Sequence, residues 1–243
     1  MKPILRLGIL QILMICCSAR GEPPTTLPTT PPKGMDAALW ARMTAIDAKA
    51  DKILDLSADF EQRKFTPLLK KPMVSSGTVK AKGYAMLWDT KSPEPTLMRV
   101  DEKEVRIFYS NQKIVEVYPL EGQLSSLAAS PLPRLAALIP HFTFAAASAK
   151  DMGEAEAGNR LALQLTPIDP SLREHVNHVT VLIDAERGFI LAFQLIDSDG
   201  ERTVIRFSNV KTNEQLDDAK LRLKLPAEVK IVRPLENLGK PAR

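Results

Sequence analysis

The side chains that could perform chemistry are few, and they are not grouped in any catalytic pattern. The chain of 243 residues has three histidines, of which His175 and His178 form the one close pair. Three residues apart on a strand, they would lie on opposite faces, which does not suit a metal ion. His141 could serve as a base only beside a nucleophile, and the sequence has no Gly-x-Ser-x-Gly, Gly-rich phosphate loop or His-Glu-x-x-His motif. We therefore expect no catalytic residue, no metal and no cofactor, and an enzyme is the least favoured class of function.

Both cysteines of the chain, Cys16 and Cys17, lie in an N-terminal segment with the features of a secretory signal peptide. A basic start and a short apolar run precede small residues at the −3 and −1 positions of two cleavage sites. We assign residues 1–21 to a signal peptide cleaved near Ala19 or Gly21, which predicts an exported protein whose mature form has no cysteine. A lipid anchor at Cys16 or Cys17 is the less favoured alternative.

The charge of the chain argues against a polyanionic partner. Lysine and arginine number 33 against 29 acidic residues, a formal net charge of +4. Three of the positive charges, Lys2, Arg6 and Arg20, fall in or beside the signal segment, so the mature chain is close to neutral. Few aromatic residues accompany the basic ones, and we expect no nucleic-acid partner. Function must then come from apolar surface.

The elements that would position such a surface begin after a linker. Residues 22–35 carry five prolines among threonines, which predicts a stiff, solvated linker. Asp36 is a suitable helix cap, and apolar residues at spacings of three and four predict a helix to about Leu54. Residues 36–243 are expected to form a single domain.

From Asp59 onward the apolar residues recur with a period of two, which is typical of strands. Asp199–Gly200 is a favourable hairpin turn, and 132–138 is the one further segment with helical character. No helix-sized crossover separates the strands, which excludes a parallel βαβ fold. The pattern predicts a mainly β (α+β) protein with about ten strands in one antiparallel sheet, strongly curved or nearly closed, and two helical pieces.

One face of this sheet is apolar, and two interpretations of it remain open. It is either the filled core of a barrel or sandwich, or a cavity for an apolar ligand that helices partly close. The alternation assigns these residues to the candidate lipid-binding lining: Tyr84, Met86, Trp88, Met98, Val100, Leu163, Leu165, Leu191 and Phe193. A shift of one residue would move them all to the opposite face.

Short motifs occur in a characteristic order along residues 36–235. They are LSADFEQ at 56–62, SGTV at 76–79, RIFY at 106–109, VEVYP at 115–119, LQLTP at 163–167, TVIRFSN at 203–209 and LP at 225–226. Their order and spacing resemble the periplasmic outer-membrane lipoprotein carrier (LolA-like) family, in which the first motif stands at the end of the first helix.

The resemblance implies an incomplete antiparallel β-barrel, a half-barrel with helices forming a lid over an apolar cavity. It also implies acylated lipoproteins, an inner-membrane ABC-type donor and an outer-membrane receptor as partners, with transient membrane contact; we expect a monomer. In the family an arginine of a Lys-Arg-Pro segment holds the lid. Here the segment reads Ala81-Lys82-Gly83, so Lys82 is the latch candidate, although lysine lacks the planar fork of arginine.

The predicted function is a non-enzymatic periplasmic carrier that binds the acyl chains of lipoproteins and moves them from the inner to the outer membrane. The alternative is a periplasmic lipid- or lipoprotein-sensing regulatory domain of the same half-barrel fold, acting through a protein partner. A free, unanchored chain favours the carrier. The proline-rich linker favours the sensor.

Overall fold

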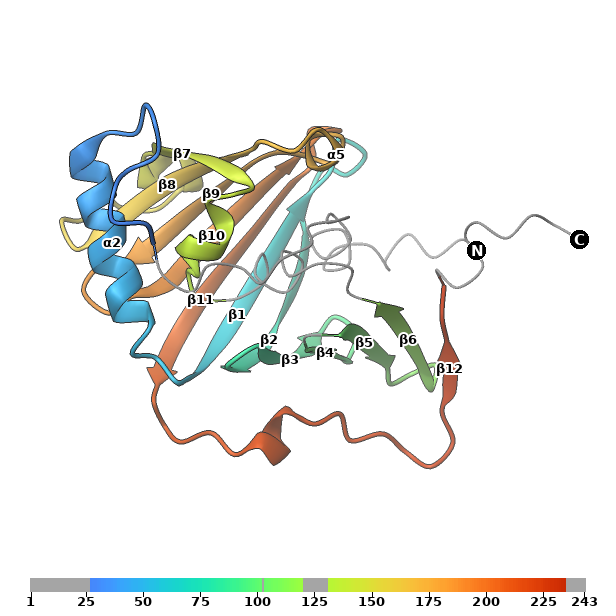
Figure 1. Cartoon of the computed structure of the whole chain (residues 1–243). Coiled ribbons are helices and arrows are strands. Elements are labelled where there is room, and N and C mark those ends of the chain that lie inside the picture. Colours follow the sequence, from blue (N-terminus) through green and yellow to red (C-terminus); the bar gives the residue numbers. More distant parts are fainter. Residues whose placement is uncertain (1–26, 102, 120–130, 235–243) are drawn as a thin grey trace, which may run out of the picture.

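The computed structural model describes residues 27–101, 103–119 and 131–234 (Figure 1). The predicted signal peptide and the first part of the predicted linker therefore lie outside the described residues. The elements are α2 (Ala37–Ala50), β1 (Asp55–Phe65), β2 (Met73–Lys82), β3 (Ala85–Ser92), β4 (Thr96–Val100), β5 (Glu104–Tyr109), β6 (Ile114–Pro119), α4 (Leu135–Leu138), β7 (Phe142–Ala146), η2 (Ala149–Met152), β8 (Arg160–Pro167), α5 (Pro170–Arg173), β9 (Val176–Asp184), β10 (Phe189–Asp197), β11 (Arg202–Thr212), η3 (Asp218–Leu221) and β12 (Lys230–Val232).

The strands form one sheet in the order β12-β6-β5-β4-β3-β2-β1-β11-β10-β9-β8-β7. Neighbouring strands are antiparallel except for β12, which pairs with β6 in parallel. Because β7 and β12 stand at opposite edges, the barrel is incomplete (Figure 1). The predicted mainly β half-barrel is confirmed, with twelve strands among the described residues instead of about ten.

Two strands absent from the prediction, β7 and β12, are edge strands without a clean alternation. In β7 only Phe142 is buried, and the other residues are half-buried or exposed. In β12 all three residues are at least partly exposed, and their backbone pairs with residues 114–116. Such strands are set by long-range pairing and not by local hydrophobic periodicity.

The segment LSADFEQ lies in β1 and not at the end of the first helix. The helix begins as predicted, because the Asp36 side chain accepts a hydrogen bond from the Leu39 amide at 2.7 Å. It ends at Ala50, earlier than Leu54, and Asp51 is its C-terminal cap. Leu54 is 71% exposed, so it does not extend the buried stripe of the helix.

The sheet packs against α2 through one large core cluster. The buried face of α2, consisting of Leu39, Trp40, Met43 and Ile46, belongs to this cluster. Leu27 and Met35 also pack against it. The end of the predicted solvated linker is therefore part of the folded domain, since its apolar side chains have a surface to bury on.

Gly77, in the SGTV motif, marks a close approach of two strands. A Cβ atom there would lie 2.0 Å from the carbonyl oxygen of Asp89 on β3. The β2–β3 register also shifts between Ser76 and Gly77. Only glycine fits this irregularity, which explains its place in the motif.

Candidate functional site

The inner face is the face of the sheet whose side chains join the core cluster with α2. One cross-strand row on it runs from β1 to β6 through Ala58, Val79, Trp88, Met98, Ile107 and Glu116. A second row runs from β1 to β8 through Gln62, Ile205, Phe193, Val181 and Leu163. The strands on both sides of β1 thus contribute to one surface.

Most of the predicted lining residues meet on the inner face. Seven of them are at most 3% exposed and belong to the same cluster: Met86, Trp88, Met98, Val100, Leu163, Leu165 and Phe193. They come from β3, β4, β8 and β10. Their role in lipid binding stays a prediction, while their common burial is a property of the structure.

Leu191 and Tyr84 do not share the full burial of these seven residues. Leu191 is half-buried and packs against both the inner cluster and a smaller cluster around η2, since β10 has a register shift between Ile190 and Ala192 that interrupts the alternation. Tyr84 is 39% exposed in the β2–β3 turn, one residue before β3 begins. The period of two does not extend into a turn, so Tyr84 does not share the face of Met86.

Lys82, the predicted latch, contacts the segment after β11 and not a helix over the inner face. Its Nζ donates to the carbonyl oxygen of Leu216 at 2.9 Å and pairs with Asp218 at 2.7 Å. The hydrogen bond with the Asp218 carboxylate raises the pKa of Lys82.

The helical cover, which we define as α2 and α4, is joined to the β2–β3 turn by Arg134, directly before α4. Arg134 donates a hydrogen bond to the Gly83 carbonyl, and its guanidinium lies 4.6 Å from the Tyr84 ring centre. Sequence reasoning missed Arg134 because its partner is 51 residues away along the chain.

Asp47 joins the two helices of the cover to each other. It lies on α2, is 6% exposed, and accepts hydrogen bonds from the backbone of Leu135 and Ala136 at the start of α4 and from that of Leu27. Burial, together with the nearby charge of Asp51, raises the pKa of Asp47 to about 6. The hydrogen bonds act in the opposite direction, so burial dominates.

An aromatic chain occupies the middle of the inner face. The Phe60 and Trp88 ring centres are 4.8 Å apart with an interplanar angle of 68°. Phe207 lies 5.9 Å from Trp88 and 6.5 Å from Phe193. Phe60 and Phe207 were missing from the predicted lining, although their alternation within β1 and β11 could have indicated them.

Buried polar side chains border the aromatic chain. Glu116, in the first cross-strand row, accepts hydrogen bonds from the hydroxyls of Tyr109 at 3.1 Å and Tyr118 at 2.8 Å. Lys64, in line with Gln62 on β1, pairs with Glu201 at 2.6 Å. The inner face is therefore amphipathic, with an apolar middle and polar groups beside it.

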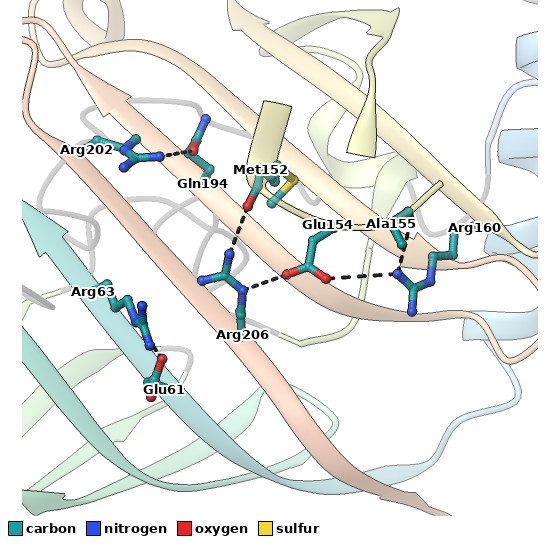
Figure 2. Close-up of polar contacts among 9 residues, drawn as sticks. All are labelled: Glu61, Arg63, Met152, Glu154, Ala155, Arg160, Gln194, Arg202 and Arg206. Atoms are coloured by element: carbon teal, nitrogen blue, oxygen red, sulfur yellow. Dashed lines mark hydrogen bonds and ion pairs between the residues drawn. The ribbon is translucent and has the colours of Figure 1, made fainter. Parts of the chain in front are cut away.

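On the opposite face of the sheet, charged side chains hold the β7–β8 connection in place (Figure 2). Arg206 on β11 pairs with Glu154 at 2.6 Å and donates to the carbonyl oxygen of Met152 at 2.8 Å. Arg160 lies 3.9 Å from the other Glu154 oxygen. These contacts fix the β7–β8 connection. Among residues 27–101, 103–119 and 131–234, no group of His, Cys, Asp and Glu is suited to a metal ion.

Comparison with known proteins agrees with this arrangement. The family model described as outer membrane lipoprotein carrier protein LolA matches residues 51–224, from before β1 to beyond η3. The chain belongs to the LolA family. The matched range includes both cross-strand rows of the inner face, and the description of the family is that of a carrier protein.

Individual relatives are more distant. An outer-membrane lipoprotein carrier protein of Dechloromonas aromatica is 28% identical over 198 residues, covering 80% of this chain and 90% of the relative. One from Pseudomonas syringae pv. tomato is 27% identical over 150 residues, covering 60% of this chain and 65% of the relative. An uncharacterized conserved protein from Thermus thermophilus has a TM-score of 0.52 at 12% identity, covering 81% of this chain and 99% of that chain. This last likeness shows the fold alone.

Proposed function

We propose that this protein is a periplasmic carrier that binds the acyl chains of lipoproteins between its sheet and its helical cover, and moves lipoproteins from the inner to the outer membrane. The observation that carries the proposal is the inner face, a single apolar surface drawn from both halves of the sheet. Membership of the LolA family supports it. In this function the protein binds and releases its cargo without a chemical step.

The physical task of such a carrier is to keep hydrocarbon from water. Hydrating an acyl chain costs about 0.8 kcal/mol per methylene, or roughly 12 kcal/mol for fifteen methylenes. An inner face lined by Met86, Met98, Phe193 and their neighbours offers apolar contacts to such a chain. Methionine is flexible, so this surface can adjust to chains of different shape.

Acyl chains reach this surface when the cover moves. The inner-face side chains are buried beneath α2 and α4 in the closed form. The α4 helix has four residues, of which Leu135 and two alanines are buried and Leu138 is partly buried against the core cluster, so its displacement exposes only these few apolar side chains of its own. Arg134 and Asp47 are polar attachments that can be broken and remade in water.

Loading and release require partners. The sequence has no nucleotide-binding loop, so an ATP-driven inner-membrane donor supplies the free energy that extracts the acyl chains, and an outer-membrane receptor takes them. The β1–β2 loop provides a transient membrane contact. Leu68 is 90% exposed and Leu69 is 48% exposed, and Lys70 and Lys71 follow them on the surface. Such a loop fits an anionic bilayer surface.

Native mass spectrometry of residues 22–243, purified from a periplasm without detergent, tests the function. A bound acylated polypeptide is the expected result. Free lipid without polypeptide would move the assignment to the alternative, a lipid-sensing domain. A protein that stays empty and also refuses apolar dyes would reject acyl binding, and the inner face would be a filled core.

A pair of introduced cysteines tests whether the cover must open before a ligand can bind. The double variant Tyr84→Cys/Arg134→Cys is joined by a bis-maleimide linker that contains a reducible disulfide and spans the length of the two side chains it replaces, in a chain whose natural cysteines lie at 16 and 17. The cross-linked form should lose binding of a fluorescent fatty acid, and reductive cleavage of the linker should restore it. The single variants treated with the same linker are the controls. Equal binding by the cross-linked and cleaved double variant would contradict opening at this contact.

A further inference from the structure

Two polar atoms on the inner face are buried without a hydrogen-bond partner in the part of the chain that the structure describes. They are the indole nitrogen Nε1 of Trp88, whose residue is 1% exposed, and the amide oxygen Oε1 of Gln62, whose residue is 5% exposed. Buried polar groups in folded proteins almost always have partners, because leaving them unpaired costs free energy. An unpaired donor and an unpaired acceptor in one core therefore call for an explanation.

Both residues are neighbours of Phe60 on the inner face. Trp88 contacts Phe60 edge to face, with ring centres 4.8 Å apart. Gln62 follows Phe60 by two residues on β1, so it shares the inner face, and it is paired across the sheet with Ile205. Gln62 also ends the LSADFEQ motif, and no hydrogen bond of its Oε1 among the described residues explains the choice of an amide there.

The two atoms have opposite hydrogen-bonding character. The indole N–H can only donate, and the amide oxygen can only accept. A hydrocarbon satisfies neither of them. An acyl chain joined through an amide offers a carbonyl acceptor and an N–H donor, whereas one joined through an ester offers acceptors alone.

We infer that Trp88 and Gln62 form a recognition pair for the amide linkage of an N-acylated ligand, with Trp88 donating to a ligand carbonyl and Gln62 accepting from a ligand N–H. The inference rests on the proposed function, since it places the acyl chains on the inner face. It adds a chemical selectivity that apolar contacts alone do not provide: the protein distinguishes an N-acyl chain from an O-acyl chain of equal length.

Three probes with a chain of twelve carbons separate the contributions. Methyl N-lauroylglycinate and methyl O-lauroylglycolate differ only in an N–H replaced by oxygen, and dodecyl methyl ether has neither the acyl carbonyl nor the ester carbonyl. Each is titrated against a bound apolar dye on residues 22–243. We expect the wild-type protein to bind the N-lauroyl probe about three- to tenfold more tightly than the O-lauroyl probe, the range for one neutral hydrogen bond.

Two variants test whether Gln62 Oε1 and Trp88 Nε1 cause the differences in affinity between the probes. Gln62→Leu should bind the N-lauroyl and O-lauroyl probes equally, because it lacks the acceptor for the N–H. Trp88→Phe should weaken both carbonyl probes about three- to tenfold relative to the ether, which serves as the internal reference for any change in packing. A wild-type preference that survives in Gln62→Leu would overturn the role of Gln62. Equal losses for all three probes in Trp88→Phe would overturn that of Trp88.

A measurement without ligand tests whether the Gln62 amide serves ligand recognition or stabilises the fold. Replacing an unpaired buried amide by an apolar side chain of similar size should leave the melting temperature of the empty protein unchanged or raise it. A clear fall in the Gln62→Leu variant would show that the amide supports the fold, and would contradict the inference. If wild-type protein binds none of the three probes, the proposed function itself fails. If it binds all of them equally, only the recognition pair fails.

Discussion

The guanidinium of Arg134 lies over the ring of Tyr84, with 4.6 Å between the guanidinium carbon and the ring centre. Arg134 also donates to the neighbouring Gly83 carbonyl. This contact joins the cover to the β2–β3 turn. The family resemblance assigned the role of holding the helices to Lys82. The positively charged side chain thus belongs to the cover, and the Gly83 carbonyl and the Tyr84 ring that it contacts belong to the turn between two strands of the sheet.

Arg134→Gln should loosen the cover. A cation–π contact at a partly exposed site contributes about 1 kcal/mol, so its loss should speed the exchange of a bound fluorescent acyl probe about fivefold. Stopped-flow displacement measures this rate. Lys82→Gln is the matched control, because Lys82 bonds Leu216 and Asp218 and not the cover. Faster exchange in Lys82→Gln with no change in Arg134→Gln would reverse the assignment.

Asp47 should make stability depend on pH in a specific direction. Its pKa is raised from 3.8 to about 6, so the folded state holds the proton more tightly than the unfolded chain. The stabilising contribution of this carboxyl is complete below the unfolded value and is lost as the pH rises through the folded one. The melting temperature of wild type relative to Asp47→Asn should therefore fall as the pH is raised across this window.

Thermal melts in half-unit steps of pH check this expectation. Asp51→Asn is the informative second variant, because the Asp51 charge helps to raise the pKa of Asp47. In that background the folded-state pKa of Asp47 is lower, so the loss should be smaller and should end at a lower pH. A constant difference between wild type and Asp47→Asn would contradict the assignment.

Leu68→Asp should reduce binding to anionic vesicles at least tenfold, since burial of one leucine side chain contributes about 1.5–3 kcal/mol. Lys70→Gln/Lys71→Gln should weaken binding further and reduce its salt dependence, at about 1 kcal/mol per lysine. Vesicle flotation measures both. Ile231→Asp is the matched control, an apolar residue 62% exposed on the edge strand β12. A similar loss in that control would exclude a specific role for the β1–β2 loop.

Gly77→Ala should destabilise the fold strongly. The added methyl would meet the Asp89 carbonyl oxygen at 2.0 Å, so the two strands must separate. We expect a loss of about 2–4 kcal/mol, in the upper range for single substitutions. Urea unfolding measures it, and Gly200→Ala is the comparison, with nothing within 4 Å of its added Cβ although its φ is +79°. Equal losses at the two sites would show that the close approach is unimportant.

The sequence predicted those parts of the fold that depend on local periodicity. Alternation placed Met86, Trp88 and Met98 on the correct face because β3 and β4 are regular strands joined by a short turn. It did not anticipate that Leu191 packs against both the inner cluster and the cluster around η2, because a register shift changes the count of residues along the strand. It also extended the face to Tyr84, which belongs to a turn.

The polar contacts of the site were beyond local patterns. Asp47 and Arg134 act on partners in other elements, and nothing in the neighbouring residues indicates which partners these are. The motif that ends at Gln62 was recognised as a resemblance, but the unpaired state of its amide oxygen emerges only when the surrounding side chains are placed. Hydrophobic periodicity thus predicts which residues share a face, whereas the polar contacts on that face depend on how distant segments pack together.

The pairing of β1 with β11 has a consequence for the order in which this chain acquires its structure. Strands β2–β6 and β7–β10 each join neighbours in sequence, whereas β1 and β11 meet across very long loops, as the 2.7 Å hydrogen bond between Asn209 and Asp59, 150 residues apart, illustrates. Closing such a loop carries a large entropic cost and slows folding. During synthesis, β1 therefore stays without one of its two strand partners until residues 202–212 have been made. Until then the backbone of β1 presents an unpaired edge, which is open to pairing with the wrong strand.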